Sequence, residues 1–565
     1  MNPTETARAQ LDFLYGREKA GEIESELAGR LASFTARYPG SPGTRPLTEK
    51  DAVLITYADQ FRRTGEPPLR TLDDFLGAYL EGAISWVHLL PYYPSSSDDG
   101  FSVIDYRSVD PAAGGWVDVA ALGKRYRLMF DAVINHVSRE SEWFRGYLRG
   151  EEDRGDFFIE VEPGAELSRV VRPRALPLLT PVETARGLRH IWTTFSDDQI
   201  DLNYANPEVL LEITDLLLFY VANGAEIIRL DAIAYLWKEI GSTCIHLPQT
   251  HAVVKFWRAV LDAVAPQVIL ITETNVPHAE NISYFGDAGD EAQMVYQFPL
   301  APLVLHSFLT GDAGALTGWA GRLEDPPADT AFFNFIASHD GFGLRPVEGL
   351  LEPEQIQALV DRTKAHGGQV SHRDNEDGSQ SVYELNITLY DFLNDPGDPD
   401  PDRDIARFLA SQTILLSLAG VPGIYVHSLL GSRNCRDCVR ETGRARSINR
   451  EKFEYARLSA DLADTQSRPA RVLQETRRML QLRGRSSAFH PAAAQRVLSL
   501  HPAVFAVRRG GQTDTAFLCL VNVSREPLRL EAGVQGRDLL SGETVSGRVV
   551  LAPYQARWIQ TDSES

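Results

Sequence analysis

The stretch GAEIIRLDA, residues 224–232, decides the fold. Its apolar run from Ala225 to Leu230 suits a strand buried on both faces, as the strands of a parallel barrel are. The run leads into Arg229 and Asp231, whose spacing of two places both side chains on the same side of a strand. In such barrels the chemistry lies at the carboxyl ends of the strands. The stretch therefore predicts a barrel strand that delivers an arginine and a carboxylate to one rim, although alone it fits a structural ion pair equally well.

Short apolar segments alternate with amphipathic helical stretches over most of the chain. Helical candidates such as TLDDFLGAYLEG and THAVVKFWRAVLDAVAP carry apolar residues at spacings of three and four. This alternation is typical of a parallel α/β architecture. The strand candidates are AVLITY from Ala52, ISWVHLL from Ile84, RLMFDAVI from Arg127, AEIIRL from Ala225, QVILIT from Gln267, QMVYQF from Gln293, AFFNFIA from Ala331 and GIYVHS from Gly423. These eight candidates predict an α/β fold, a (β/α)8 TIM barrel.

The pattern divides the chain into several parts. Residues 1–50 are expected to form a helical prefix, and residues 51–137 with 198–487 the barrel. Residues 138–197 and 341–403 are too long for simple loops, so we expect an inserted domain B and a second insertion at the catalytic rim. From residue 488 to 565, short strands separated by turns predict a C-terminal β-sandwich domain.

The charge argues against two classes of partner. The chain has 77 acidic and 56 basic residues and a formal net charge of −21. Neither nucleic acid nor an anionic membrane accepts such a surface without a local basic patch. The chain shows no secretory leader and no apolar run of transmembrane length, so we expect a cytoplasmic location. Whether the chain forms a homo-oligomer is left open.

The cysteines are few. Four in this length are too few for a disulfide scaffold, and a reducing compartment fits. Cys435 and Cys438 form a CxxC motif without a second pair. A zinc or redox site would need that second pair or a thioredoxin-like context. We therefore expect incidental loop cysteines.

Polar residues gather at the expected carboxyl ends of four strands. They are Asp131 and His136 after the third strand, Arg229 and Asp231 after the fourth, Glu273 after the fifth, and His339 and Asp340 after the seventh. Because the strand ends of a barrel share one rim, these side chains should converge there. Cleavage of a glycosidic bond with retention needs two carboxyl groups roughly 5–5.5 Å apart, one as nucleophile and one as acid and then base.

Asp231 and Glu273 fit these two roles. We expect Arg229 to keep Asp231 ionised, because a nearby positive charge lowers the pKa of a carboxyl group. Glu273 follows the apolar run VILIT, which is expected to raise its pKa so that it is protonated when substrate binds. Asp340 and His339 would grip sugar hydroxyls more strongly in the transition state than in the ground state.

The segments DAVINH, GAEIIRLDA, ITETN and ASHD together resemble the four sequence regions of the α-amylase family. The resemblance covers nearly the whole chain. It implies Asp231 as nucleophile, Glu273 as general acid and base, and Asp340 as transition-state stabiliser. It further implies a glucose subsite supported by Asp131, His136, Arg229 and His339.

Three other segments, SSSDDGFSVIDYRSVDP, HDGFGLRPVEGLL and RARSINRE, resemble the sucrose-phosphorylase branch of this family, whose members transfer glucose to phosphate. The resemblance implies that Asp98 and Arg446 pair at the closed end of the subsite and hold the glucose 4-hydroxyl. It also implies that Phe101 is an apolar platform for the sugar. The alternatives are a loop salt bridge for Asp98 and Arg446, and a packing role for Phe101.

The second insertion is expected to supply phosphate contacts. Its VYELN matches the moving loop of the branch, which makes Tyr383 a candidate, with His366, His372 and Arg373 as basic neighbours. Asn275 departs from the branch, because sucrose phosphorylases carry a histidine two positions after the acid/base, and this puts sucrose in doubt.

Arginines after the eighth strand suggest an anionic acceptor. Arg433 lies in the turn LLGSRN and is followed by Arg436, Arg440 and Arg444. Arginine forks bind carboxylates in bidentate fashion, and the extended form of the chain resembles glucosylglycerate phosphorylases, whose leaving group is D-glycerate. The alternatives are a phosphate group in the same place, as in a sucrose 6-phosphate phosphorylase, or a solvated arginine-rich loop.

The sequence thus favours reversible phosphorolysis of 2-O-α-D-glucosyl-D-glycerate to α-D-glucose 1-phosphate and D-glycerate by double displacement. Phosphorylases of sucrose 6-phosphate, sucrose or glucosylglycerol are the near alternatives, followed by a hydrolase or transglucosidase with the same carboxylates. A catalytically silent sugar-binding protein would have no reason to keep both Asp231 and Glu273. We expect small-molecule substrates, no cofactor and no metal, since no cluster has metal-ligand spacing.

Overall fold

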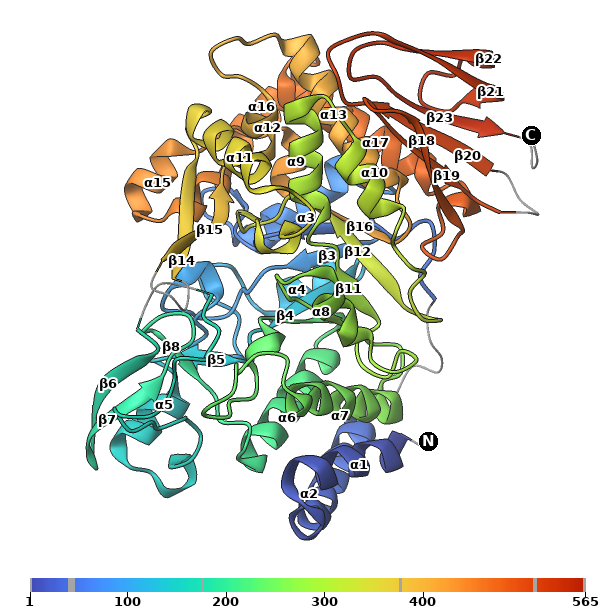
Figure 1. Ribbon diagram of the computed structural model, residues 1–565. Coiled ribbons are helices and arrows are strands. Elements are labelled where there is room, and N and C mark those ends of the chain that lie inside the picture. Colours follow the sequence, from blue (N-terminus) through green and yellow to red (C-terminus); the bar gives the residue numbers. More distant parts are fainter. Residues whose placement is uncertain (1–2, 39–45, 174–176, 375–378, 512–515, 562–565) are drawn as a thin grey trace.

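The computed structural model describes residues 3–38, 46–173, 177–374, 379–511 and 516–561. Eight parallel strands close into a barrel in the hydrogen-bonded order β1-β16-β12-β11-β10-β9-β4-β3, at the centre of Figure 1. Each falls on a strand expected from the sequence, so the TIM barrel is confirmed. The strands are β1 (Val53–Thr56), β3 (Trp86–Leu89), β4 (Arg127–Ala132), β9 (Ala225–Leu230), β10 (Ile269–Thr272), β11 (Met294–Tyr296), β12 (Ala331–Phe335) and β16 (Val421–Tyr425).

Helices surround the barrel because their apolar faces pack on its strands. Several begin at an N-cap residue. At the start of α6, for example, the Asn206 side chain accepts a hydrogen bond from the backbone N–H of Glu208, and Pro207 occupies the first turn. The surrounding helices are α3 (Pro68–Tyr79), α4 (Trp116–Leu122), α6 (Pro207–Ala222), α7 (Pro248–Val264), α8 (His278–Ile282), α9 (Leu300–Thr310), α10 (Gly314–Ala320), α13 (Pro401–Ser417), α14 (Val426–Leu430), α16 (Tyr455–Ala463) and α17 (Arg468–Arg483). A short parallel pair, β2 (Phe61–Arg62) with β17 (Phe453–Glu454), joins the first loop to the last part of the barrel.

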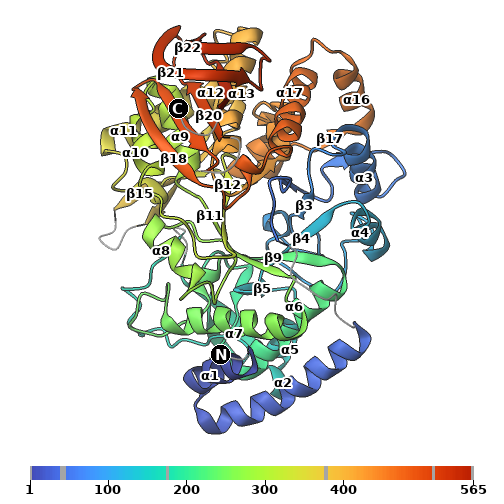
Figure 2. The same cartoon turned by 90° about the vertical axis from the view of Figure 1, so that its right-hand side faces the viewer.

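The N-terminal prefix is a pair of helices, α1 (Pro3–Tyr15) and α2 (Arg17–Arg37), linked at Gly16. Figure 2 shows them beneath α6 and α7, and α1 packs on α7 while α2 packs on α6. The Tyr15 hydroxyl donates to the carbonyl oxygen of Tyr204 at 2.8 Å. The prefix therefore lies against the outer helices of the barrel.

Two insertions follow the third and seventh barrel strands. The first holds β5 (His136–Ser138), α5 (Glu142–Arg149), β6 (Leu179–Thr184), β7 (Gly187–Trp192) and β8 (Gln199–Asp201), with Trp192 buried in a small core of its own. The second forms the three-stranded sheet β13-β15-β14 with α11 and α12. Its elements are β13 (Phe342–Gly343), α11 (Pro353–Ala365), β14 (Gln369–Asp374), β15 (Gln380–Asn386) and α12 (Leu389–Leu393).

The C-terminal part is one antiparallel sheet of six strands in the order β18-β19-β20-β23-β21-β22. One face packs on the barrel through Phe505, Phe517 and Trp558. The β21–β22 hairpin folds over the other face, where Leu530 and Val549 join a second core. The expected sandwich is thus a single sheet. The strands are β18 (Gln495–His501), β19 (Val504–Arg509), β20 (Ala516–Asn522), β21 (Leu528–Asp538), β22 (Thr544–Leu551) and β23 (Ala556–Thr561).

A disulfide joins Cys435 and Cys438 at the start of α15 (Arg436–Thr442). The expectation of incidental cysteines is therefore wrong, because the CxxC spacing brings the two sulfur atoms into bonding contact.

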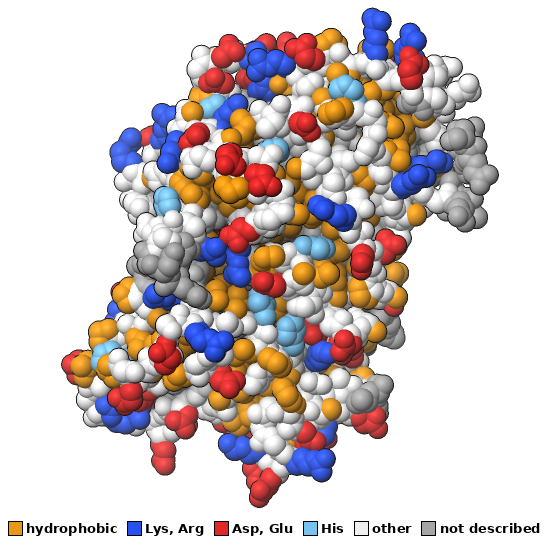
Figure 3. Space-filling model, viewed as in Figure 1, with side chains coloured by type: hydrophobic (Ala, Val, Ile, Leu, Met, Phe, Trp, Pro, Cys, Tyr) orange, Lys and Arg blue, Asp and Glu red, His pale blue; other side chains and the backbone are white. Residues whose placement is uncertain are grey.

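Acidic and basic side chains are interspersed over the face shown in Figure 3. Within the described ranges, no helix combines the length and apolar character needed to span a bilayer.

Candidate active site

A cavity of about 1050 Å³ lies at the carboxyl end of the barrel strands. Ten of the residues expected from the sequence line it, and they come from seven different segments of the chain. They are Asp98, Phe101, His136, Arg229, Asp231, Glu273, His339, Asp340, Tyr383 and Arg446. The barrel register therefore brings together residues that lie up to several hundred positions apart in sequence.

Arg229 binds two aspartates side by side. Strand pairing places Asp131 of β4 directly beside Arg229 of β9. Arg229 Nη1 donates to Asp131 Oδ1 and, at 2.7 Å, to Asp231 Oδ1. His88 Nε2 lies 2.6 Å from the other oxygen of Asp131. Asp131 is fully buried behind the cavity, and although burial would raise its pKa, Arg229 and His88 lower it. Asp131 thus stays charged and orients Arg229.

Glu273 lies on the other side of Arg229. Its Oε2 accepts a hydrogen bond from the Ala232 backbone N–H at 3.2 Å and lies 3.9 Å from Arg229 Nη2. Ala232 has a φ of 50°, which is unusual for a residue with a side chain and turns its N–H toward Glu273. The backbone directly after Asp231 therefore positions the second carboxyl group.

Burial dominates the protonation of this carboxyl pair. It raises the pKa of Asp231 to about 8, helped by the charges of Glu273 and Asp131 and opposed by Arg229. Burial also raises the pKa of Glu273. The expectation that Arg229 holds the pKa of Asp231 low is therefore wrong, because the desolvation of the carboxylate outweighs the effect of one arginine. The two groups titrate as a pair that retains a proton near neutral pH.

Asp340 has the opposite electrostatics. Burial would raise its pKa, but Arg446, His339 and Arg450 lower it well below the ordinary range. Arg446 Nη1 lies 2.6 Å from Asp340 Oδ1, and Arg450 Nη2 lies 3.9 Å from the same oxygen. The charges around Asp340 therefore favour its anionic form.

Sequence reasoning missed Glu384. Its two oxygens accept hydrogen bonds from Arg446 Nε at 3.0 Å and Arg446 Nη2 at 2.9 Å, and its side chain is 3% exposed. Glu384 lies on β15, which is paired with β13 at the Gly343 position. The signal was present in VYELN, beside Tyr383, but only the fold shows that this strand faces Arg446. Arg446 thus joins a barrel carboxylate to the second insertion.

Asp98 and Arg446 both line the cavity, and the charge of Asp98 raises the pKa of Arg446. Arg446 also contacts Asp340 and Glu384. Asp98 and Asp99 both have positive φ values, 54° and 51°, which aspartate tolerates better than most residues. Asp99 binds Arg450, whose Nε donates to the His339 carbonyl oxygen at 2.8 Å.

Two rings form one wall. Phe101 and His339 stack with their centroids 4.9 Å apart and their planes at 2°. Burial lowers the pKa of His339 to about 3, so the imidazole is neutral and its stacked face is compatible with an apolar platform. His136 Nε2 lies 3.0 Å from the Phe101 carbonyl oxygen and ties the platform to the first insertion.

Tyr235, Asn275, Gly343 and Tyr383 also line the cavity. The Asn275 side-chain amide lies over Gly343, where an added Cβ would meet it at 2.5 Å. Asn275 Oδ1 is buried and has no hydrogen-bond partner among the described residues. The charges of Arg345 and Arg373 reach the Tyr235 hydroxyl and oppose the rise in its pKa that burial causes.

Several expected cationic residues lie outside this cavity. Arg433 lines a second cavity and donates from Nε to Asp391 Oδ1 at 2.7 Å, so its expected place at the acceptor mouth is not what the structure shows. His366 Nδ1 lies 2.6 Å from the Asp391 carbonyl oxygen, and Arg373 binds Glu348 at 2.9 Å. His372, Arg436, Arg440 and Arg444 likewise do not line the cavity.

The donor set does not suit a metal ion. No group of three histidine, cysteine or carboxylate side chains within the described ranges has a geometry that could hold one. The site instead combines a pair of buried carboxyl groups, a carboxylate whose pKa is lowered and a stacked ring platform. This arrangement suits a neutral polyhydroxyl substrate that develops positive charge.

Comparison with known proteins agrees with this chemistry. The family model of the α-amylase catalytic domain matches residues 79–310. The chain is 52% identical over 550 residues to the glucosylglycerate phosphorylase of Allomeiothermus silvanus, with 97% of each chain covered. The chain belongs to the α-amylase family, in its sucrose-phosphorylase-like branch.

Other members of this branch give the same result. The glucosylglycerate phosphorylase of Escherichia coli is 45% identical over 553 residues, covering 97% of this chain and 99% of that one. The crystal structure of sucrose 6F-phosphate phosphorylase from Thermoanaerobacter thermosaccharolyticum has a TM-score of 0.74 at 22% identity, over 89% of this chain and 98% of that one. That likeness supports the α-amylase fold of the whole chain.

Proposed function

We propose that this α-amylase family member is a retaining phosphorylase that converts 2-O-α-D-glucosyl-D-glycerate and phosphate to α-D-glucose 1-phosphate and D-glycerate. The observation that carries the substrate is the identity of 52% along nearly the full length with a glucosylglycerate phosphorylase. The chemistry is supported by the buried pair of Asp231 and Glu273 beside Arg229.

The proposed reaction proceeds by two displacements. Asp231 attacks the anomeric carbon while protonated Glu273 gives its proton to the leaving glycerate oxygen, which forms a glucosyl ester on Asp231. Phosphate then attacks the same carbon from the vacated side, breaks the ester and gives its proton to Glu273. Arg229 is 2.7 Å from Asp231 and 3.9 Å from Glu273, so it favours negative charge on Asp231 more strongly than on Glu273.

The remaining residues hold the sugar. Asp340 is charged and bound to Arg446, so it can accept hydrogen bonds from hydroxyls as the oxocarbenium-like transition state forms. Phe101 and His339 offer a flat apolar wall, with His136 behind it. Asp98 and Arg446 mark the closed end of the subsite, where they would meet the 4-hydroxyl.

The acceptor side is proposed to comprise Tyr235, Asn275 and Tyr383, with Arg345 and Arg373 providing positive potential behind them. Both arginines act on the Tyr235 hydroxyl at the cavity rim. An anionic acceptor or phosphate would benefit from this potential, and Arg433 is not needed for it.

A cytoplasmic location remains part of the proposal, as does the exclusion of nucleic acid and membrane as partners.

The test is reverse synthesis from α-D-glucose 1-phosphate with D-glycerate, fructose, fructose 6-phosphate, glycerol or water, followed by phosphate release. We expect rapid release with D-glycerate and a slow background with water. Preference for fructose 6-phosphate or glycerol would contradict the proposed acceptor while keeping the two-step mechanism. Release with water alone would identify a hydrolase.

A further inference from the structure

A second cavity of about 1170 Å³ lies on the other side of the segment that carries Arg446. One wall is formed by residues 432–437, and the other by residues 451–458 and the start of α17. The arginines 433 and 436 that stand out in the sequence therefore belong to this cavity. Neither the proposed reaction nor the packing of the barrel uses the space between these walls.

Four arginines face this cavity: Arg433, Arg436, Arg457 and Arg468. Arg433 is bound to Asp391. The other three have no ion pair with any residue that the structure describes. Arg468 is the deepest of these three, and its guanidinium lies 5.2 Å from the Tyr390 ring centroid. Its Nε is buried without a hydrogen-bond partner among the described residues. Guanidinium forks arranged around a cavity match the oxygens of a phosphoryl group.

Carboxylates share the same walls. Lys452 is matched by Asp59 at 2.6 Å and Asp437 by Arg440 at 2.7 Å, so these groups are already paired. Glu451, Glu454 and Asp461 remain on the lining without an ion pair within the described residues. An ionised carboxylate can accept hydrogen bonds but cannot donate them, so its partners in a ligand would be hydroxyl groups. The mixture of arginines and carboxylates therefore fits a ligand with both a phosphoryl group and hydroxyls.

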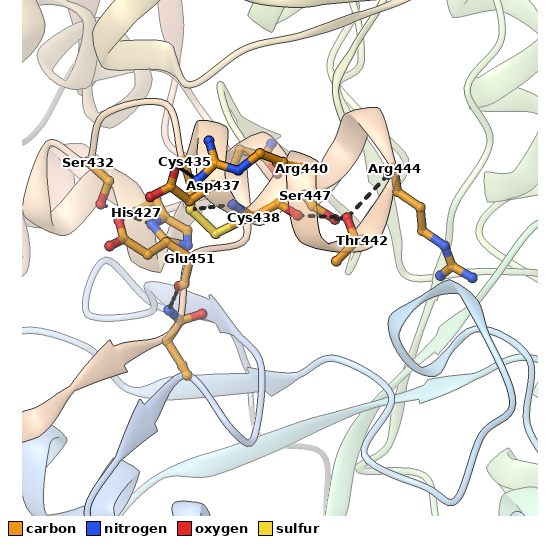
Figure 4. The surroundings of a disulfide bond; sticks show 12 residues. His427, Ser432, Cys435, Asp437, Cys438, Arg440, Thr442, Arg444, Ser447 and Glu451 are labelled. Atoms are coloured by element: carbon orange, nitrogen blue, oxygen red, sulfur yellow. Dashed lines mark hydrogen bonds and ion pairs between the residues drawn. A yellow bond between two sulfur atoms is a disulfide. The ribbon is translucent and has the colours of Figure 1, made fainter.

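The cavity is mechanically linked to the active site. Its two walls are the two ends of one segment, which contains α15 and the short helix η6 (Ala445–Asn449) with Arg446. The Cys435 backbone N–H donates to the Ile448 carbonyl oxygen at 2.8 Å, and the disulfide to Cys438 closes the first turn of α15. Figure 4 shows this turn, with Cys435, Asp437 and Cys438 beside one another and Glu451 below them. Asn449 Nδ2 then donates to the Asp340 carbonyl oxygen at 2.9 Å.

We propose that this cavity binds a hydroxylated phosphate ester of the sugar phosphate class, which bridges the two walls and holds the Arg446 segment against Asp340. The phosphoryl group lies between Arg457, Arg468 and Arg436, and the ligand hydroxyls donate to Glu451 and its acidic neighbours. No covalent step is involved. The proposal does not depend on which reaction the barrel catalyses.

Equilibrium dialysis of the full chain with radiolabelled α-D-glucose 1-phosphate tests the site. We expect Arg457→Gln and Arg468→Gln each to bind one equivalent fewer than the wild type, whatever the active centre binds. Arg457 is exposed on α16, so its replacement remains informative if Arg468→Gln disturbs the packing on Tyr390. Arg529→Gln, an exposed arginine on β21, is the matched control and should keep the wild-type stoichiometry.

Equal stoichiometry in all four proteins would overturn the site. A parallel dialysis with inorganic phosphate separates the ester from its phosphoryl group: phosphate binding as tight as that of the ester would overturn the role of the hydroxyls. Amide hydrogen exchange in residues 438–450 tests whether the ester holds the Arg446 segment in place. Saturating ester should slow exchange there at least several-fold in the wild type and not in Arg457→Gln. Unchanged exchange in the wild type would overturn the proposal that the ester holds this segment against Asp340.

Discussion

Glu384→Gln tests whether the second insertion acts on catalysis through Arg446. The wild-type carboxylate accepts two hydrogen bonds from Arg446, at 2.9 and 3.0 Å, in a place where Glu384 is 3% exposed. Glutamine keeps the shape and one acceptor oxygen, but its amide group donates and so repels the second guanidinium N–H. The change therefore removes one charge-assisted hydrogen bond, worth about 1.5–3 kcal/mol.

We expect this loss to appear in the transition state, because Arg446 also holds Asp340 Oδ1 at 2.6 Å. A loss of about 1.5–3 kcal/mol corresponds to a fall in kcat/KM of roughly 10- to 150-fold. The assay is the initial rate of phosphorolysis of glucosylglycerate, with α-D-glucosyl fluoride as a second donor that needs no acid catalysis. Both donors should lose rate, because Arg446 and Asp340 act on the sugar and not on the leaving group.

Glu348→Gln is the matched control for this experiment. Glu348 lies in the same insertion and binds Arg373 at 2.9 Å, but it is 48% exposed, and surface pairs contribute little. We expect its kcat/KM to stay within about twofold of the wild type. A Glu384→Gln enzyme that is folded and within twofold of the wild type would refute the argument that Arg446 transmits its charge to Asp340.

Three further predictions concern the site. Folding raises the pKa of Asp231 from 3.8 to about 8, so this carboxyl destabilises the folded protein as the pH rises through that range, and Asp231→Asn should raise the urea midpoint at pH 7. Folding lowers the pKa of Asp340, so Asp340→Asn should reduce the urea midpoint; midpoint shifts of the same sign in the two variants would contradict both assignments. In Glu273→Gln, the acid limb of the rate with α-D-glucosyl fluoride should move to lower pH, since the charge of Glu273 raises the pKa of Asp231; an unmoved limb would show that the two groups are not coupled. Gly343→Ala should push Asn275 aside and raise KM for D-glycerate at least several-fold in reverse synthesis, with a smaller effect on α-D-glucose 1-phosphate, and an equal effect on both would place Asn275 in the sugar subsite.

The barrel and its catalytic rim were predictable from local sequence. Each strand is a short apolar run, and parallel pairing in register forces Asp131, Arg229 and Glu273 to one edge. No long-range information is needed for that step, because the fold class alone fixes which strand ends meet. The resemblance in four short segments added the roles, and comparison along nearly the full chain supported the family.

The misses have a common physical cause. The positions of Arg433, of Glu384 and of the β21–β22 hairpin depend on how a loop, an insertion and the C-terminal sheet pack in three dimensions, which no periodicity encodes. The pKa of Asp231 was misjudged because the sequence shows the neighbouring arginine but not the depth of burial. The Cys435–Cys438 bond was missed because a lone CxxC does not say whether its sulfur atoms face each other.

The site is built from two arginines that each bridge two carboxylates, and this symmetry explains why its acids titrate so differently. Arg229 joins buried Asp131 to Asp231, and Arg446 joins buried Glu384 to Asp340. The first arginine is opposed by Glu273, whose charge adds to the effect of burial and raises the pKa of Asp231. The second is reinforced by Arg450 and His339, which lower the pKa of Asp340 further. A proton can therefore move within the first group during the two proposed displacements, while the second group keeps its charge. A nucleophile with its acid requires the first property, and a stabiliser of positive charge requires the second.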